Sequence, residues 1–335
     1  MLAIDTGPAC NNRCHGCPRV GDGPRDPGGD GAPLPPPPRD GAELVVHGGE
    51  PTLHPGFVEL LAAARQADLA LRVETNARAF ASPGRAATAH AAGLTAATIT
   101  LWGATAASHD FLTRTPGSFR QTVAGAMALR AAGVRLSFRL LLTRTALPEL
   151  GAMTSVAIGL GAQALRLSWA RMEPRPPGFA VPAPPAAVDD PADPKGPLRI
   201  DRNTPAGDRD GYDATREWLV PRYALSGEAV AAAVRGVARA TRTGAGLAAP
   251  TVAVMVDGVP LCLLPPGALA TPPQPSCHQP GGPTDRGDAF AAPCQGCAAR
   301  TRCPGVPRGY LARFGDGELA PLPAAAGGAA GERPL

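Results

Sequence analysis

The chain has 335 residues, enough for one large domain or two ordinary ones with a buried core. Its net charge is +4 and no lysine or arginine run forms a basic patch, which argues against a nucleic-acid-binding protein. No uncharged apolar run of about 18 residues occurs and the first ten residues lack a signal-peptide pattern, so we expect a cytoplasmic protein with no membrane span.

Three of the eight cysteines follow the first expected strand (residues 2–6) at the spacing C-x3-C-x2-C. They are Cys10, Cys14 and Cys17. In a reducing compartment such clusters bind metal more often than they form disulfides. Three thiolates would leave one iron of a four-iron cluster open, whereas a zinc site would need a fourth ligand from His15 or a distant residue. The spacing alone leaves both alternatives open.

Strands and helices alternate after a proline- and glycine-rich loop over residues 18–42. Apolar runs predict further strands at 42–48, 69–76, 96–102, 134–143 and 164–170. Helices are expected at 54–68, 82–93, 118–133 and 147–161, the third with a capping box formed by Ser118 and Gln121. Six strands separated mostly by helices predict an α/β fold, an open and partial (β/α)6 barrel with its chemistry at the carboxyl ends of the strands.

The alternation stops near residue 172, and four regions are predicted. Residues 1–172 form the core, 173–250 a Pro/Asp-rich linker with a helix at 226–242, 251–321 a small cysteine-rich domain, and 322–335 a disordered tail. A strand and turn are expected at 251–264, before the remaining cysteines. These are Cys262, Cys277, Cys294, Cys297 and Cys303.

The second strand ends in the motif Gly48-Gly49-Glu50-Pro51. Two adjacent glycines allow the backbone to approach a ligand closely, and Glu50 could supply a charge for an amine. Alone, the motif could be a turn before a helix that begins with proline. Its position one strand after the cysteine loop favours a shared site.

The cysteine loop followed by GGEP resembles the radical S-adenosylmethionine (SAM) superfamily, over residues 1–172 and including the stretch 99–119. The resemblance implies that the three cysteines hold a [4Fe–4S] cluster whose open iron chelates SAM, and that residues 48–51 bind the methionine amino group. It also implies cleavage of SAM to a 5′-deoxyadenosyl radical that abstracts a substrate hydrogen. Thr75, Asn76 and Thr100 would reach SAM by their positions. Gly16 and Trp102 depart from the residues usual in the family.

The C-terminal cysteines resemble the auxiliary-cluster domains called SPASM and twitch, through the spacing Cys294-x2-Cys297-x5-Cys303. The resemblance implies one auxiliary [4Fe–4S] cluster held by these three cysteines and by either Cys262 or Cys277. Position 307 is proline where the full SPASM pattern has a further cysteine. A structural zinc ribbon is the alternative, because four thiolates suit zinc equally well.

The resemblance therefore predicts a radical SAM enzyme, an oxidoreductase or maturase, acting on a peptide or a small molecule. A flavodoxin- or ferredoxin-type electron donor is the expected partner, with neither nucleic acid nor membrane. Because Cys10 comes so early, we expect any leader-binding domain to be a separate protein or absent. The competing hypothesis is a non-catalytic, zinc-stabilised binding module, which does not need the GGEP motif.

Other polar and aromatic residues are expected to have structural roles. We expect His109 and Asp110 to be a helix-capping or barrel-edge feature rather than a catalytic pair. Strand parity would let Glu74 and Arg139 face the interior of the barrel, and the alternative is that each belongs only to a structural ion pair. Trp102 and Trp169 are expected to pack in the core.

Overall fold

The computed structural model describes residues 2–15, 17, 33–37, 43–170, 219–240, 252–264, 288–301 and 303–323. The expectations for Cys277, for most of the linker and for nearly all of the tail lie outside these residues. Within them, no helix combines the length and the apolar character needed to cross a bilayer.

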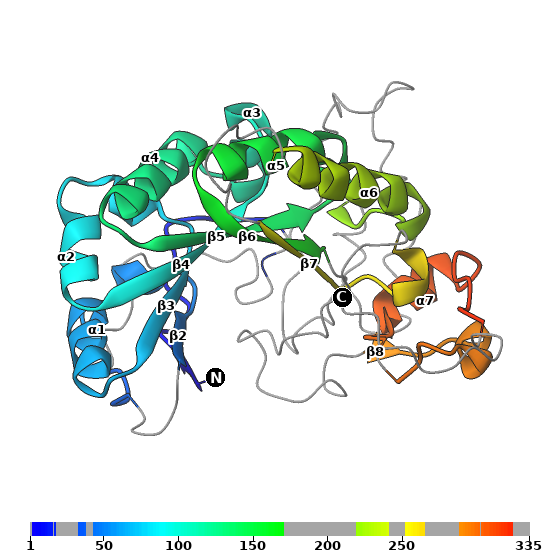
Figure 1. Ribbon diagram of the computed structural model, residues 1–335, viewed down its shortest axis with the longest axis horizontal. Helices are drawn as coiled ribbons and strands as arrows, with labels where there is room; N and C mark the ends of the chain where they lie inside the picture. The colour runs from blue at the N-terminus through cyan, green and yellow to red at the C-terminus, as the bar shows by residue number, and fades with distance from the viewer. Residues whose placement is uncertain are drawn as a thin grey trace.

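Seven strands form one sheet in which every neighbouring pair is parallel and the spatial order follows the chain, β1 to β7 (Figure 1). The strands are β1 Leu2–Asp5, β2 Glu43–His47, β3 Ala70–Thr75, β4 Leu94–Leu101, β5 Arg135–Leu142, β6 Ala162–Trp169 and β7 Ala253–Asp257. With all strands parallel, every strand delivers its carboxyl end to the same edge of the sheet, where side chains from distant parts of the sequence meet.

Helices cover one face of this curved sheet (Figure 1). They are α1 Phe57–Gln66, α2 Arg85–Ala91, α3 Ala106–Thr113, α4 Ser118–Ala131, α5 Leu150–Gly159 and α6 Tyr223–Ala240. Alternate strand residues such as Val73, Ile99 and Phe138 are fully buried in the core beneath them. Burial of these apolar side chains is the main stabilising contribution to the fold.

The opposite face of the sheet is polar. Residues in register across β3, β4 and β5 place Glu74 beside Thr98, and Arg139 beside Thr100. The Arg139 Nη2 atom lies 3.4 Å from Glu74 Oε1, and both side chains are largely buried. Glu74 and Arg139 thus face the interior and also form an ion pair with each other, and the concave face of the sheet is lined with charged and hydroxyl groups.

The six predicted strands are confirmed, and the structure adds a seventh. Strand β7, from the region expected to start the cysteine-rich domain, pairs with β6 in the main sheet. The sheet does not close into a barrel. The predicted capping box of Ser118 and Gln121 is wrong, because α4 begins after Gly117 with no side-chain cap of its own and the Ser118 hydroxyl donates to Asp110 Oδ1 at 2.8 Å.

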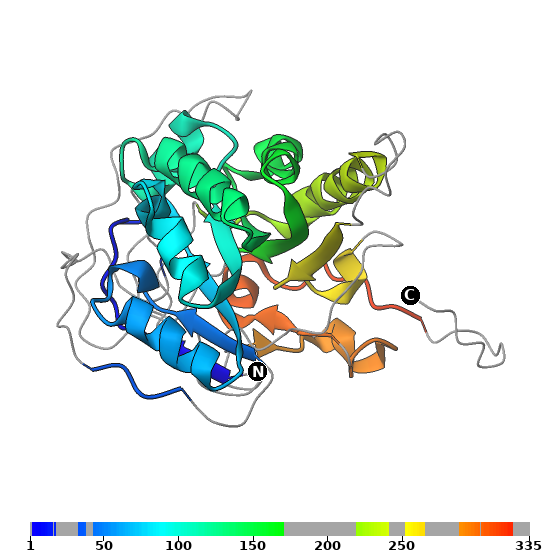
Figure 2. The same ribbon diagram turned by 60° about the vertical axis from the view of Figure 1, so that its left-hand side comes forward.

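The C-terminal segments are short and lie beside the β7 end of the sheet (Figure 2). They comprise the 3-10 turns η5 Leu261–Leu263 and η7 Ala292–Gly296, the two-residue strands β8 Asp288–Ala289 and β9 Val306–Pro307, and helix α7 Arg308–Phe314. A stack of aromatic rings joins them to the core. Trp169, Tyr223, Tyr310 and Phe314 follow one another with centroid separations of 4.7, 4.1 and 4.7 Å.

Candidate functional site

The N-terminal cysteine loop continues from β1 along the end of β2. The amide of Gly49 donates to the carbonyl of Gly7 at 2.8 Å, and that of Glu50 donates to Ala9 at 2.7 Å. These bonds extend the pairing of β1 with β2 past the strand ends. The backbone that precedes Cys10 is therefore fixed against the GGEP motif, as its expected role requires.

The far side of the same loop is anchored on the end of α3. The amides of Arg13 and His15 donate to the carbonyls of Thr113 and Leu112, at 3.0 and 2.8 Å. Between these anchors Cys14 is buried against a small apolar group. Its members are Trp102, Leu112 and Leu219, with Cys17, Phe111 and Leu141 at the edge. The packing expected for Trp102 is confirmed, and so is that of Trp169 in the main core.

The two glycines of the motif are required by the close approach of the cysteine loop. A Cβ atom on Gly49 would lie 2.3 Å from the carbonyl oxygens of Pro8 and Ala9, and one on Gly48 would lie 2.3 Å from the Thr6 hydroxyl. Both distances are shorter than any carbon–oxygen contact. We expected close approach to a ligand here; what the structure shows is close approach between two loops.

The carboxylate of Glu50 is buried and already bonded. Its Oε1 atom accepts from the hydroxyls of Thr52 and Thr75, both at 2.6 Å, and its Oε2 atom accepts from the amide of Asn76 at 2.7 Å. Burial raises the pKa of Glu50, and these hydrogen bonds oppose that shift. Glu50 thus ties the end of β2 to the end of β3, while Pro51 begins the short 3-10 turn Pro51–Leu53.

Asn76 and Arg78 connect the end of β3 to the cysteine loop. The Asn76 side chain donates to Asn11 Oδ1 at 2.7 Å and lies 4.0 Å from the Cys10 sulfur. Arg78 donates to the backbone carbonyl of Asn11 and to Asn12 Oδ1. Asn76 was predicted from the sequence and Arg78 was not, since nothing in the local pattern distinguishes Arg78 from other arginines.

Thr100 projects from β4 on the polar face of the sheet and is partly exposed. Thr75 alternates to the other face, where it is buried and bonded to Glu50. The two threonines expected to reach SAM thus differ in their environment. Only Thr100 faces the concave side, and Thr75 acts on the site through Glu50.

His109 and Asp110 have the structural roles that were expected. Asp110 accepts from the amides of Gly117 and Phe119, at 2.6 and 2.7 Å, and so caps α4 from the preceding helix. Burial raises the pKa of Asp110, but these hydrogen bonds outweigh it and lower the pKa overall. His109 is buried, its Nδ1 atom accepts from the amide of Trp102 at 3.4 Å, and burial lowers its pKa to about 4.

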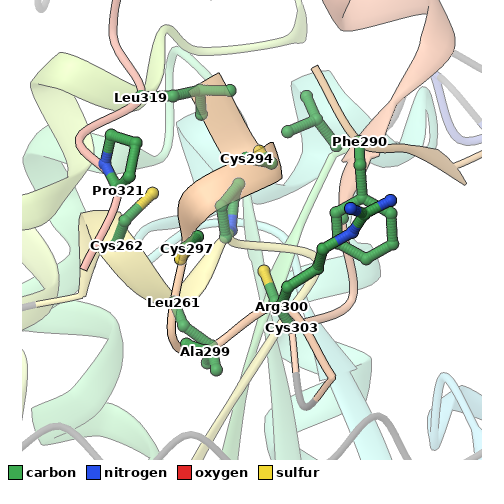
Figure 3. A pocket seen from close by; sticks show the side chains of 13 residues that line it. Leu261, Cys262, Phe290, Cys294, Cys297, Ala299, Arg300, Cys303, Leu319 and Pro321 are labelled. Atoms are coloured by element: carbon green, nitrogen blue, oxygen red, sulfur yellow. The ribbon is translucent and has the colours of Figure 1, made fainter. Parts of the chain in front are cut away.

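A second group of thiols surrounds one small pocket in the C-terminal region (Figure 3). Cys262 comes from η5, Cys294 and Cys297 from η7 and its end, and Cys303 from the turn before β9. Burial raises the pKa of the Cys262 thiol, and the other three cysteines act in the same direction. The structure thus brings together four of the five C-terminal cysteines. Cys277, the fifth, lies outside the described residues.

An aromatic ring and a cation form one side of this pocket. The guanidinium carbon of Arg300 lies 5.1 Å from the centroid of the Phe290 ring, and both side chains line the hollow (Figure 3). The amide of Cys297 donates to the carbonyl of Cys294 at 3.2 Å, and the amide of Cys303 donates to Ala299 at 2.9 Å. These turns set the direction of the three thiols from this segment.

The donors grouped at both sites are thiols, and thiolates are the protein ligands of iron–sulfur clusters. Among the described residues, no three Cys, His, Asp or Glu side chains converge on a single point as the ligands of one metal ion do. In a four-iron cluster each thiolate binds a different iron atom, so the sulfurs surround the cluster instead of converging. The seven described cysteines form no disulfide with one another.

The chain matches no family model. It is similar to the PqqA peptide cyclase of Ruegeria pomeroyi, with 31% identity over 126 residues, which are 38% of this chain and 33% of the cyclase. The chain therefore spans about a third of the length of the curated relative it matches.

Solved structures give weaker likenesses. Streptococcus suis SuiB bound to precursor peptide SuiA has 12% identity and a TM-score of 0.40, over 50% of this chain and 38% of that one. The enzyme anSMEcpe with bound AdoMet and a peptide has 14% identity and a TM-score of 0.40, over 53% of each chain. The radical SAM methyltransferase TsrM from Kitasatospora setae has 16% identity and a TM-score of 0.36, over 51% and 36%. At such scores these likenesses carry no argument about function.

Proposed function

We propose that this chain is a radical SAM enzyme that acts on a peptide substrate with the help of one auxiliary iron–sulfur cluster. The observation that carries the proposal is the fixed position of the three-cysteine loop. Backbone bonds to Gly49 and Glu50, and side-chain bonds from Asn76 and Arg78, hold it at the carboxyl ends of three parallel strands. Parallel α/β proteins build their ligand sites at this edge.

Cys10, Cys14 and Cys17 would hold the catalytic cluster. When bound and reduced, a [4Fe–4S] cluster with one open iron supplies the electron that cleaves SAM to a 5′-deoxyadenosyl radical. The protein has to hold the thiols in place, bind the methionine part of SAM beside them and shield the radical from water. The packing of Cys14 against Trp102 and Leu112 contributes to that shielding.

Residues 48–51, with Thr75, Asn76 and Thr100, would bind SAM. Both oxygens of the Glu50 carboxylate already accept hydrogen bonds from the protein. We therefore assign recognition of the methionine amino group to main-chain groups of the motif, with the Glu50 side chain fixing their position. Thr100 would contact SAM from the concave face.

The auxiliary cluster would be held by Cys262, Cys294, Cys297 and Cys303, which line one pocket. Four thiolates complete the ligand set, so Cys277 is not needed. A cluster with no open iron transfers electrons or stabilises the fold and does not bind substrate directly. Reduction of either cluster requires an external donor of the flavodoxin or ferredoxin type.

A peptide is the favoured substrate because the curated relative is a peptide cyclase. The polar concave face offers the hydrogen-bonding surface that a peptide backbone needs, through groups such as Thr98, Thr100 and the Glu74–Arg139 pair. Within that face the buried Nε atom of Arg139 and the Oγ atom of Ser168 have no hydrogen-bond partner. A bound substrate could satisfy them.

Anaerobic reconstitution tests the proposal. Protein loaded with iron and sulfide should bind about eight irons, four per cluster, and after reduction by dithionite should convert SAM to 5′-deoxyadenosine. The competing hypothesis, a zinc-stabilised binding module, predicts stoichiometric zinc, no iron and no 5′-deoxyadenosine. Zinc in both sites with no SAM cleavage would refute the proposal.

A further inference from the structure

We propose that Arg78, together with Asn76, raises the reduction potential of the cluster bound by the N-terminal thiols. Arg78 is a positioning and tuning residue in this proposal, which rests on the proposed function of that site. The inference comes from the contacts that hold a cation on the loop between Cys10 and Cys14.

Arg78 opens the short 3-10 turn Arg78–Ala81 at the end of β3. One of its terminal nitrogens, Nη1, bonds the backbone carbonyl of Asn11 and lies 2.7 Å from Asn12 Oδ1. Its Nε donates to Gln121 Oε1 at 2.7 Å. The guanidinium thus spans from α4 to the loop between Cys10 and Cys14.

The electrostatic surroundings of Arg78 include both thiols. Burial lowers the pKa of its guanidinium, whereas Cys10, Glu50, Cys14 and Asp110 act in the opposite direction. The group nevertheless remains a cation at any physiological pH. A positive charge is therefore held in partly buried surroundings, where charges interact more strongly than in water.

Two N–H groups also point at the Cys10 sulfur. The backbone amide of Asn12 lies 3.4 Å from it, and the Asn76 side-chain amide 4.0 Å. Hydrogen bonds to ligand sulfurs and nearby positive charge are established determinants of iron–sulfur potentials. Both favour the reduced form, which carries one more negative charge.

The cation is held rigidly by a strained backbone. Ala77 has a left-handed conformation, with φ of 61°. Such a conformation is unfavourable in a residue other than glycine. A Cβ atom on Gly125 of α4 would lie 2.0 Å from the Ala77 carbonyl, so the helix packs directly on this peptide. The Thr122 hydroxyl donates to the carbonyl of Asn76 at 2.9 Å and completes the clamp.

Redox titration of the full-length, iron-loaded protein tests this role, with the signal of the N-terminal cluster followed by electron paramagnetic resonance. At the midpoint potential of the wild type, Arg78→Gln should lower the ratio of reduced to oxidised cluster about tenfold, which corresponds to about 59 mV for one electron. Arg78→Lys, which keeps the charge, should recover at least half of the shift. Arg130→Gln is the matched control, because this exposed arginine donates to the carbonyl of Gly159 in α5.

A wild-type potential in an Arg78→Gln protein with normal iron content would overturn the inference. If the Arg78→Gln protein fails to bind the cluster, the same titration of the Asn76→Asp protein tests the inference. A new negative charge beside Cys10 should lower the reduction potential. An unchanged potential would again overturn the inference. Failure of the wild type to bind iron would refute the proposed function itself, and this separates the two failures.

Discussion

The N-terminal cysteines lie on a loop held between strand ends and helices, whereas the C-terminal cysteines lie on short turns around a small pocket. The first loop is bonded to Gly49, Glu50, Thr113 and Arg78, which come from the ends of β2, α3 and β3. The second set combines local turn bonds, such as Cys297 to Cys294, with a bond from the Ala298 amide to the Leu322 carbonyl and the short β8–β9 pairing. The difference leads us to expect distinct roles. The N-terminal loop would present three ligands on a scaffold that is already folded. The four C-terminal cysteines would themselves stabilise the fold of their segment when they bind a cluster.

The largest expected effect separates the two sites by chemistry. Cys14→Ala should reduce 5′-deoxyadenosine formation to background and remove about four irons, because it deletes a proposed ligand of the proposed catalytic cluster. Cys297→Ala should also remove about four irons but leave measurable SAM cleavage. Iron analysis and chromatography of the SAM products check both variants. Undiminished cleavage by Cys14→Ala would eliminate the assignment of the N-terminal site.

The second prediction concerns the completeness of the C-terminal site. Cys262→Ala should remove about four irons and lower the melting temperature, because a metal site in a segment with little core contributes to folding. Cys277→Ala should change neither quantity. Iron content and thermal unfolding of the two variants provide the measurement. The reverse result would show that Cys277 is the fourth ligand.

A third prediction compares one kind of substitution in the two regions. Gly49→Ala places a Cβ atom 2.3 Å from two carbonyl oxygens of the cysteine loop and should cost about 1–3 kcal/mol of unfolding free energy. Gly296→Ala, between Cys294 and Cys297, meets nothing within 4 Å and should change the stability by less than about 0.5 kcal/mol. Urea unfolding measures both. Equal costs would contradict the view that only the first loop is tightly packed.

The smallest effect is a pH dependence confined to the N-terminal site. The pKa of His109 is about 4 in the folded protein and near 6.5 in an unfolded chain, so the unfolded state binds the extra proton as the pH falls. Stability is therefore lost between pH 6.5 and 4, by about 1 kcal/mol from pH 7 to 5.5. The described residues from 252 onward contain no histidine.

His109→Gln should remove this part of the pH dependence in urea unfolding. Hydrogen exchange at the Arg13 and His15 amides should also become less sensitive to pH, because both bond the end of the helix that carries His109. An identical pH dependence in the wild type and the variant would assign the effect to another group.

The sequence predicted the strands well because each is a short apolar run with turn residues at its ends. It did not predict where β7 would pair, since the neighbour of a strand is set by contacts distant in the chain. Helix α3 was missed for a related reason. Its capping box of Thr105 and Ser108 lies in a stretch identified by family likeness and not by its helical pattern.

The cysteines of the candidate site were identified from the sequence, but the residues that hold them in place were identified less well. Spacing identified the cysteines, yet only folding shows Cys262 beside the other three. The charge of Glu50 suggested a ligand for an amine, but its oxygens bind Thr52, Thr75 and Asn76. No local pattern reveals that the Glu50 carboxylate or the Arg78 guanidinium will form hydrogen bonds with residues distant in the chain.

The order of strands in the sheet is also the order in which a ribosome makes them. A nascent chain can add each parallel strand to the edge of those already formed, starting from β1. The loop with Cys10 can bond to α3 only after Thr113 has been synthesised. Arg78 can bond to Gln121 only after that residue, too, has been synthesised. If metal were inserted before that point in translation, the thiols would not yet be held by the contacts from Thr113 and Gln121. We therefore expect a cluster to be inserted only after the first four helices, α1 to α4, have left the ribosome.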